Sequence, residues 1–412
     1  MISLDLIRNE TQKVKEMLGY RNDNVDIDRL LELDTEYRSA LKDLESLQAK
    51  RNELAKIGNA SVAEIAKALK AQIVQVSALV DNLLSERNKI WSIVPNMLDE
   101  RVPQGKSDAD NVEIKRVGTP RKFTFEPKWH DELATKLGIL DVKNGIKVSA
   151  SGFLYWIGDG ARLQRAMFNF AQDFLLQRGF TLLTTPLLAR KETFFGTGYL
   201  PFAGDQLYTV GDTGLSLIGT SEQTLVGFHA GETIDLTKGA ILYTALTPCF
   251  RTEAGSYGKE TKGVFRVHQF SKVEQIVFCK PEESRKWHNF CLENEETLFQ
   301  KLGLPYRVVN VCTGDLGAPA SMKYDIEGFF PAYNGYRELT SNSNLLDFQT
   351  RRLNVKFKNG DKSEYPHTIS ATGITERAML AILENYQNED GNITIPEVLV
   401  PYMGGQTIIT KK

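Results

Sequence analysis

Residues 249–274 read CFRTEAGSYGKETKGVFRVHQFSKVE, and the spacing of charged, aromatic and glycine residues in this stretch predicts a strand–loop–strand hairpin. Alternate residues of a strand share one face. In the second half of the stretch one face would carry Arg266, His268, Phe270, Lys272 and Glu274. The other face would carry Phe265, Val267 and Val273. A strand that only packs in a core has no such polar face, so we expect the hairpin to hold a ligand, such as a nucleotide.

The first half of the stretch adds two charged side chains and a pliable connection. Arg251 and Glu253 lie two residues apart and point the same way from a strand. The glycines that free the loop to bend are Gly255, Gly258 and Gly263. The alternative is a solvated hairpin with alternating charges, but the density of arginine, glutamate and glycine favours a binding site.

This stretch resembles motif 2 of class II aminoacyl-tRNA synthetases, and its detailed form is similar to the seryl-tRNA synthetase family. The resemblance runs along nearly the whole chain. It covers an N-terminal helical arm, VPQGKSDADNVE from Val102, TTPLL around Pro186, LIGTSEQ from Leu217, RELTSNSNLLDFQTRR from Arg337 and AILENYQ from Ala381.

The composition of the chain limits which classes of protein it can belong to and in which compartment it can act. The 412 residues include 50 basic and 52 acidic ones, a net charge of −2, so RNA contact must rest on a local patch. The cysteines lack ligand spacing, which argues against zinc and disulfides: Cys249, Cys279, Cys291 and Cys312. The N-terminus carries early acids, and no run is apolar enough to cross a membrane, so we expect a cytoplasmic protein.

Two long helices dominate the first hundred residues. The first has a heptad seam of Leu30, Leu33, Tyr37, Ala40, Leu44, Leu47, Arg51 and Leu54. On the second we expect a stripe of Ile65, Leu69, Val76, Leu79, Leu83, Ile90 and Ile93, ended by Pro95. A turn with an N-cap between them at Gly58, Asn59 and Ser61 predicts an antiparallel coiled coil over about 28–95.

The tip half of this arm is basic. Residues 50–70 contain five basic and two acidic side chains, a net charge of +3. Such a patch suits phosphate contact, although a spacer or dimerising coiled coil would fit the residues equally well. The resemblance implies that the arm grips the long variable arm of tRNA(Ser), and of tRNA(Sec) where that exists.

The rest of the chain predicts an α+β fold. We expect an arm domain over 1–100, a polar linker over 101–120 and a catalytic domain over 121–412. A helix over 159–178 and strand-like runs over 240–246, 264–278 and 354–357 indicate an antiparallel sheet flanked by helices. The resemblance implies the class II catalytic fold, with the site on the open face of the sheet.

The resemblance implies ATP-dependent activation of L-serine to seryl-adenylate and pyrophosphate, followed by transfer to tRNA. Neither step needs a protein nucleophile, because positioning and charge stabilisation suffice. His268 is accordingly expected to be a hydrogen-bonded residue and not a general base. Arg251 matches the arginine that binds the α-phosphate, and Phe270 matches the ring that stacks on adenine. Arg377 matches the arginine of motif 3. Arg251 and Arg377 are therefore the expected catalytic residues.

The implied ligand sets overlap. The ATP set is Arg251, Thr252, Glu253, Arg266, Val267, Phe270, Glu338, Leu339, Thr340, Ser341 and Arg377. The serine set is Thr220, Ser221, Glu222, Arg251, Glu274 and Thr372. Glu338 and Ser341 match the oxygen ligands of Mg²⁺.

Several positions depart from the family pattern. The interval from Gly373 to Arg377 is one residue short, and Glu376 is an acid that could pair with Arg377 or shift its reach. Ser370 stands where asparagine is common, and Asn342 stands where cysteine is common.

The resemblance also implies a homodimer through motif 1 at Pro186, although a proline ending an edge strand fits equally. Two alternatives to a tRNA-charging enzyme stay open: a ligase that loads a carrier protein, and a catalytically weak paralogue that binds RNA or a partner.

Overall fold

The structure is a computed structural model that describes residues 1–57, 63–254 and 263–411. The chain divides into two compact units, Met1–Pro95 and Asn96–Lys412. The predicted turn residues Gly58, Asn59 and Ser61 and the loop glycines Gly255 and Gly258 lie outside the described residues.

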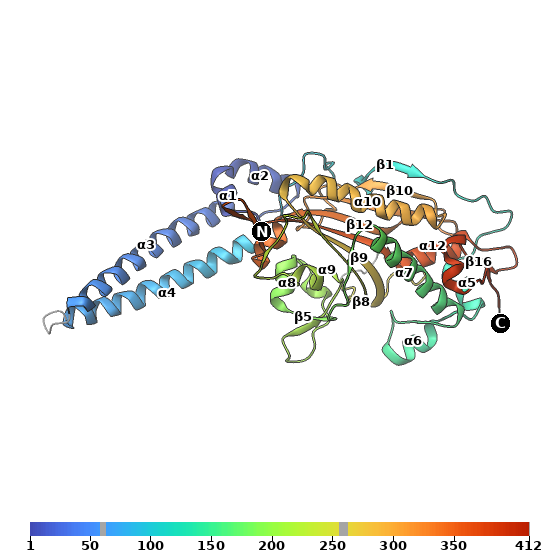
Figure 1. Ribbon diagram of the computed structural model, residues 1–412, viewed down its shortest axis with the longest axis horizontal. Coiled ribbons are helices and arrows are strands. Elements are labelled where there is room, and N and C mark those ends of the chain that lie inside the picture. Colours follow the sequence, from blue (N-terminus) through green and yellow to red (C-terminus); the bar gives the residue numbers. More distant parts are fainter. Residues whose placement is uncertain (58–62, 255–262, 412) are drawn as a thin grey trace. The chain divides into compact units, whose positions relative to one another are not determined.

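The first unit consists of four helices, α1 (Leu4–Asn9), α2 (Thr11–Tyr20), α3 (Ile27–Ile57) and α4 (Ala63–Ile93). The long helices α3 and α4 have 31 residues each, about 45 Å at 1.5 Å per residue, and run side by side as the predicted hairpin (Figure 1). Helix α4 ends two residues before Pro95, where a proline restricts the preceding backbone.

The expected stripe on α4 is partly wrong. Ile65, Leu79 and Ile93 are 56%, 49% and 41% exposed. The residues that face α3 follow a heptad spacing of four and three: Leu69, Ile73, Val76, Val80, Leu83, Arg87 and Ile90. The predicted stripe of apolar residues does not include Arg87, because arginine is charged, but the structure buries this side chain.

Asp34 explains this buried arginine. The Asp34 carboxylate accepts hydrogen bonds from Nε and Nη2 of Arg8 at 2.8 and 3.0 Å. It accepts a third hydrogen bond from Nη1 of Arg87 at 3.3 Å. The Arg87 guanidinium also lies 4.4 Å from the centroid of the Tyr37 ring. A buried charge is tolerated where it is paired and hydrogen-bonded, and here the pairing ties α1, α3 and α4 together.

An eight-stranded sheet organises the second unit, as the predicted α+β fold requires. Its order is β1-β10-β11-β12-β15-β9-β8-β4. The bounds are β1 (Val112–Val117), β10 (Tyr306–Asn310), β11 (Met322–Phe330), β12 (Gly335–Leu346), β15 (His367–Thr375), β9 (Gln269–Cys279), β8 (Ile241–Phe250) and β4 (Thr181–Leu182). All neighbours pair antiparallel except β4 and β8.

The remaining elements connect or cover this sheet. The helices are α5 (His130–Lys136), α6 (Val142–Ser149), α7 (Asp159–Gln177), α8 (Lys191–Thr197), α9 (Glu222–Gly227), α10 (Ser284–Lys301), α11 (Phe348–Leu353) and α12 (Glu376–Asn385). Short strands are β2 (Leu140–Asp141), β3 (Tyr155–Trp156), β5 (Leu188–Arg190), β6 (Leu215–Leu217), β7 (Thr233–Ile234), β13 (Lys356–Asn359), β14 (Lys362–Glu364), β16 (Ile393–Thr394) and β17 (Ile408–Ile409).

Two expectations about strands need correction. The segment 112–117, expected in the linker over 101–120, forms the edge strand β1 and pairs with β10. Val112 and Ile114 alternate with Glu113 and Lys115, which is a strand pattern, although the two apolar side chains are 45% and 50% exposed. The strand expected over 264–278 begins only at Gln269, because residues 264–268 make bends around the pocket.

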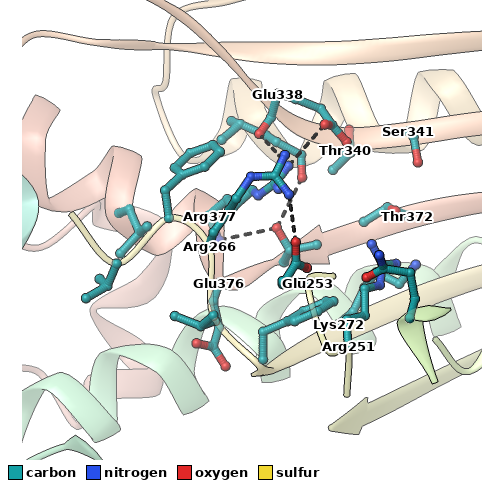
Figure 2. A pocket seen from close by; sticks show the side chains of 18 of the residues that line it. Arg251, Glu253, Arg266, Lys272, Glu338, Thr340, Ser341, Thr372, Glu376 and Arg377 are labelled. Carbon is teal, nitrogen blue, oxygen red and sulfur yellow. Dashed lines mark hydrogen bonds and ion pairs between the residues drawn. The ribbon is translucent and has the colours of Figure 1, made fainter. Parts of the chain in front are cut away.

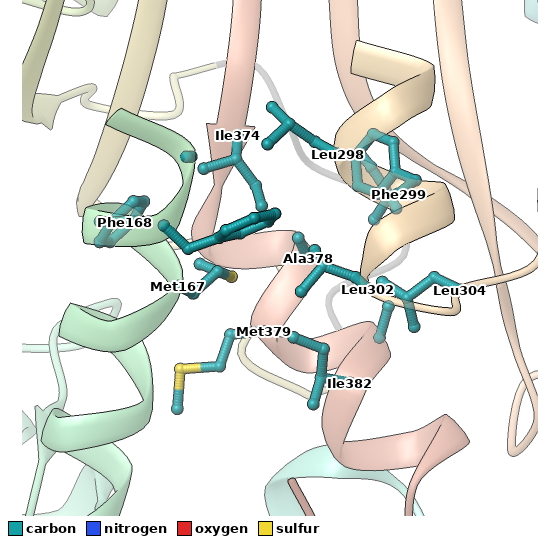
Figure 3. Packing of buried hydrophobic residues seen from close by; sticks show 14 of the residues in the cluster. Met167, Phe168, Leu298, Phe299, Leu302, Leu304, Ile374, Ala378, Met379 and Ile382 are labelled. Atoms are coloured by element: carbon teal, nitrogen blue, oxygen red, sulfur yellow. The ribbon is translucent and has the colours of Figure 1, made fainter. Parts of the chain in front are cut away.

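The helices α7, α10 and α12 share one apolar core with the sheet. Met167 and Phe168 of α7, Leu298 of α10 and Met379 of α12 belong to this core. Figure 3 shows α12 lying between α7 and the C-terminal end of α10, and its N-terminus, which begins at Glu376, is thereby held in place.

Polar contacts fix which face of the sheet α10 covers. Asn294 of α10 donates to Gln275 of β9 at 2.8 Å. His288 of α10 and Asn342 of β12 exchange two bonds, His288 Nε2 to the Asn342 carbonyl at 3.0 Å and Asn342 Nδ2 to the His288 carbonyl at 2.9 Å. Because neighbouring residues of a strand alternate, Glu274 points to the opposite face. That opposite face carries the site.

Candidate active site

A pocket of about 450 Å³ lies on this face of the sheet (Figure 2). It gathers segments far apart in the sequence: the ends of β8 and β9, strand β12, the junction of β15 with α12, and residues 154–156 and 199–206. The lining residues expected for ATP or serine are Arg251, Glu253, Arg266, Val267, Phe270, Glu338, Leu339, Thr340, Ser341, Thr372 and Arg377.

Strand register explains why distant motifs meet in this pocket. Thr372 of β15 lies opposite Glu274 of β9, and Ser341 of β12 lies opposite Asp325 of β11. Residues directly opposite each other in an antiparallel pair have Cβ atoms about 5 Å apart. The candidate metal ligand Ser341 and the candidate serine ligands therefore share one face of adjacent strands.

Arg251 follows directly after β8. Its backbone N–H donates to the His268 carbonyl at 3.0 Å, and its Nε donates to the Gly219 carbonyl at 3.3 Å. The guanidinium lies 5.3 Å from the centroid of the Phe270 ring. This arrangement holds a permanently charged fork in the lining of the pocket, where it can take a phosphate or carboxylate bidentately.

His268 is hydrogen-bonded, as expected. Its Nδ1 lies 3.0 Å from both the Arg251 carbonyl and the Tyr208 hydroxyl, and its ring stacks on Phe153 at 5.4 Å between centroids. A side chain beyond the α-carbon of Gly152 would collide with this ring. His268 therefore acts as a packing and hydrogen-bonding residue at the base of the loop.

Glu253 and Arg266 form an ion pair with each other. Arg266 Nη1 lies 2.7 Å from Glu253 Oε2. Glu253 has a positive φ of 52°, a conformation that costs a non-glycine residue of the order of 1 kcal/mol or more. The ion pair holds both side chains toward the pocket despite that cost.

Thr252 is the expected ATP residue that the structure does not bring to the pocket. Its hydroxyl donates to the Asp205 carbonyl at 2.5 Å, and its N–H donates to the Gln206 carbonyl at 3.1 Å. These bonds tie residues 205–206 to the motif 2 strand.

The segment 199–206 is a wall of the pocket that sequence reasoning missed. Tyr199, Ala203 and Gln206 line the cavity, and Gln206 Nε2 donates to the Ala254 carbonyl at 2.8 Å. Arg352 supports the segment by donating to the Phe195 and Leu200 carbonyls at 3.0 and 3.1 Å. The segment has no periodicity, so only the contacts of Thr252 and Arg352 could have revealed it.

Arg377 reaches the pocket from the first turn of α12. Its Nη1 lies 3.1 Å from Glu338 Oε2, and its guanidinium lies 4.4 Å from the centroid of the Phe265 ring. Glu376 does not pair with it. The Glu376 carboxylate accepts Ser271 N–H at 2.8 Å and Trp156 Nε1–H at 3.4 Å, and burial raises its pKa. The register between β15 and β9 shifts between Thr372 and Ile374, just before α12.

Glu338 and Ser341 offer oxygen atoms at the nucleotide end. Burial favours a raised pKa for Glu338, but the charges of Arg377 and Lys323 outweigh it and lower this pKa below its usual value. Asp325, which we did not predict, pairs with Lys323 at 3.1 Å beside Ser341, and burial raises its pKa to about 7. In the described parts of the chain no three acidic, histidine or cysteine side chains converge as a metal cluster.

The expected serine residues form a buried wall next to Thr372. Thr220 Oγ1 donates to Glu274 Oε2 at 2.8 Å, and Ser370 Oγ donates to Glu274 Oε1 at 3.4 Å. Ser370 thus reaches Glu274 although it replaces the common asparagine. Ser221 is fully buried at the start of α9.

Glu222 is the second carboxyl group of this wall. It accepts Gln349 Nε2–H at 2.7 Å, and its N–H donates to Thr220 Oγ1 at 3.2 Å. Burial and then the charge of Glu274 raise its pKa to about 7.

The chain is similar to known proteins over its full length. The family "Seryl-tRNA synthetase N-terminal domain" matches residues 1–98, and "tRNA synthetase class II core domain (G, H, P, S and T)" matches residues 208–386. A serine--tRNA ligase of Dictyoglomus thermophilum is 43% identical, with all of both chains covered.

Solved structures agree with these matches. The crystal structure of a seryl-tRNA synthetase from Pyrococcus horikoshii complexed with ATP is 38% identical, has a TM-score of 0.93 and covers all of both chains. A cytoplasmic serine-tRNA ligase from Naegleria fowleri in complex with AMP is 33% identical, with a TM-score of 0.87 over 97% of this chain and 96% of that one. The chain therefore belongs to the seryl-tRNA synthetase family, whose motifs the pocket assembles.

Proposed function

We propose that the pocket activates L-serine with ATP and transfers the seryl group to tRNA(Ser), and to tRNA(Sec) where that exists. The observation that carries this proposal is one cavity that Arg251, Arg266 and Arg377, the expected phosphate contacts, line together with Thr372. Glu274, which is hydrogen-bonded to Thr220, lies opposite Thr372 in the sheet. In the first step a serine carboxylate oxygen bonds to the α-phosphorus and pyrophosphate leaves. In the second, a terminal ribose hydroxyl of tRNA attacks the seryl carbonyl and AMP leaves.

The arginines perform the electrostatic part of this chemistry. Arg251 neutralises charge on the α-phosphate and orients the serine carboxylate. Arg266 and Arg377 take the distal phosphates, in competition with the carboxylates that now hold them. Phe270 and Val267 supply apolar surface for the adenine, and Glu253, Leu339 and Thr340 complete the nucleotide wall.

Glu338 and Ser341 fit a Mg²⁺ ion. A carboxylate and a hydroxyl are hard oxygen donors, and Mg²⁺ in nucleotide sites takes one or two protein oxygens, phosphate oxygens and water. Glu338 is 48% exposed and its pKa is lowered, so it is an ionised ligand facing the pocket. When bound, the ion would add positive charge on the phosphates.

The serine end recognises an ammonium and a hydroxyl. Glu274 accepts from the ammonium, Thr220, Ser221 and Glu222 shape the wall, and Thr372 contacts the side-chain hydroxyl. A site that pairs with a hydroxyl penalises alanine by up to about 10⁴- to 10⁵-fold, whereas excluding threonine depends on pocket size and is weaker.

The direct test is exchange of labelled pyrophosphate into ATP. Purified protein should catalyse exchange that requires serine and Mg²⁺, with threonine, alanine and glycine giving far lower kcat/KM. The change Arg377→Ala should raise the KM for ATP at least tenfold, since one phosphate contact is lost. Absence of serine-dependent exchange in folded protein would contradict the proposal.

The arm is proposed to bind tRNA. The basic side chains of its tip half are exposed: Lys50, Arg51, Lys56, Lys67 and Lys70. Removing residues 28–95 should leave pyrophosphate exchange intact and abolish charging of tRNA. If charging survived, tRNA binding would lie elsewhere and the carrier-protein alternative would gain weight.

We also propose a homodimer through the motif 1 region. Around Pro186 the side chains of Leu182, Leu187 and Leu188 are 43%, 36% and 37% exposed. An apolar strip beside the sheet edge β4 supports a protein contact there. Sedimentation equilibrium should give twice the chain mass, and Leu188→Arg should shift the protein toward monomer.

A further inference from the structure

Lys272 lines the pocket at the amino-acid end. It is not one of the residues that the sequence predicts to bind serine. It stands on β9 two residues before Glu274, so both side chains point to the same face, and the two form a direct ion pair. Their side chains are 9% and 2% exposed. Figure 2 shows Lys272 beside Arg251. Burying an ammonium is costly, so its pairing with Glu274 calls for a function.

The two oxygens of Glu274 are used unequally. Oε2 takes both Lys272 and the Thr220 hydroxyl, the latter at 2.8 Å. Oε1 receives a long bond of 3.4 Å from Ser370. A carboxylate offers about four lone-pair positions, so Oε1 retains acceptor capacity on the side away from Lys272.

A second carboxyl group makes the lysine necessary. Glu222 shares Thr220 with Glu274, because Thr220 Oγ1 accepts the Glu222 N–H and donates to Glu274. Two acids in one buried wall repel each other, and the charge of Lys272 opposes that repulsion for Glu222. Lys272 therefore holds the Glu274 carboxylate in place through their direct contact.

We propose that Lys272 is a positioning residue for serine, which fixes Oε2 of Glu274 so that Oε1 is presented to the substrate ammonium. The inference rests on the proposed serine site and adds a residue to it. Lys272 itself does not transfer a proton or touch ATP. Its contribution is to serine affinity, since an unfixed carboxylate must be ordered again each time serine binds.

The test compares Lys272→Met with Lys272→Arg in pyrophosphate exchange, varying serine and ATP separately. Lys272→Met keeps an unbranched side chain that is one atom shorter and removes its charge. It should raise the KM for serine at least tenfold while the KM for ATP stays within twofold. Lys272→Arg restores the charge and should recover at least part of the serine affinity.

Lys323→Met is the matched control. Lys323 is also a strand lysine paired with an acid two residues on, Asp325, and its side chain is 20% exposed. It lies at the nucleotide end, near Glu338. Its loss should leave the KM for serine within twofold and show instead in the KM for ATP.

The outcomes separate the two proposals. If Lys272→Met lowers the urea midpoint but leaves the KM for serine unchanged, or if it raises both KM values equally, Lys272 is a structural ion pair and the inference fails. If Lys272→Met does not fold, Lys272→Arg decides alone: a change in the KM for serine with the KM for ATP within twofold of wild type supports the inference, and any other result overturns it. A wild type without serine-dependent exchange refutes the proposed function instead.

Discussion

The two ends of the pocket hold their cations in different ways. At the nucleotide end, two arginines are held by carboxylates from neighbouring segments, Arg266 by Glu253 at 2.7 Å and Arg377 by Glu338 at 3.1 Å. These four side chains are between 18% and 48% exposed. At the amino-acid end, Lys272 and Glu274 pair in direct contact and are almost fully buried.

This difference in exposure indicates which ion pairs can exchange their carboxylate for a phosphate of the substrate. A solvent-exposed ion pair contributes about 0–1 kcal/mol, so a phosphate can displace its carboxylate at little cost. Removing one partner of a buried pair costs about 3–5 kcal/mol, because the other charge is left uncompensated. The nucleotide end is therefore suited to trading partners when ATP enters, and the amino-acid end to staying assembled.

The largest expected effect comes from removing the acid of each pair. Glu274→Gln leaves the Lys272 ammonium buried and should lower the free energy of unfolding by about 3–5 kcal/mol. Glu253→Gln leaves Arg266 near solvent and should lower it by less than about 1 kcal/mol. Urea unfolding of both variants measures the contrast, and equal losses would abolish the distinction between the two ends.

Arg251 lines the pocket and, as the proposed contact of the α-phosphate and of the serine carboxylate, should dominate catalysis. Arg251→Ala removes a positioned charge at the α-phosphate, and loss of one such group typically lowers kcat by about 10²- to 10³-fold. Arg251→Lys should recover little of it, because a lysine cannot bind bidentately. The readout is kcat for serine-dependent exchange. A loss under tenfold for the alanine variant would move the central role to another arginine.

A pH dependence sharpens the description of the amino-acid end. The pKa of Glu222 is raised from 4.5 to about 7, first by burial and then by Glu274. The folded state thus holds this proton more tightly than the unfolded chain. The stability that this proton contributes is fully present below about pH 4.5 and is lost as the pH rises through 7.

Glu222→Gln removes this titration. Between pH 5 and pH 8 the wild type should lose roughly 2 kcal/mol more stability than the variant, a figure reduced to allow for partial exposure. Urea midpoints at the two pH values measure the difference. Parallel curves for the two proteins would show that Glu222 is ionised throughout.

Much of this contrast could be predicted from sequence, because strand alternation is local. Reading motif 2 with a period of two put Lys272 and Glu274 on one face, and β9 has them there. The pairing itself could have been inferred from that spacing. The motif arginines and Glu338 also line one pocket, to which Arg251 comes from the end of β8, Arg377 from the first turn of α12 and Glu338 from within β12.

What sequence could not give depends on contacts between distant segments. The wall made by residues 199–206 has no pattern of its own and is placed by Thr252 and Arg352. The direction of Glu376 is set by Ser271 and Trp156, which lie more than 100 positions away in the chain. Arg87 on the arm was missed for the same reason, because its burial depends on Asp34.

The smallest expected effect is that of Thr252→Ala, which tests whether a residue of motif 2 that lies outside the pocket affects ATP. Thr252 belongs to the motif by sequence, but its hydroxyl bonds to the Asp205 carbonyl and does not face the cavity. Thr252→Ala should therefore lose one hydrogen bond, about 1 kcal/mol of stability, and change kcat/KM for ATP by less than threefold. Glu253→Gln, one residue on, should change the KM for ATP more and lower it, because it removes the carboxylate that competes with the phosphates for Arg266. If Thr252→Ala had the larger effect on ATP, the segment 203–206 would be controlling the nucleotide end through Thr252, and the exposed ion pairs would matter less than the wall that encloses them.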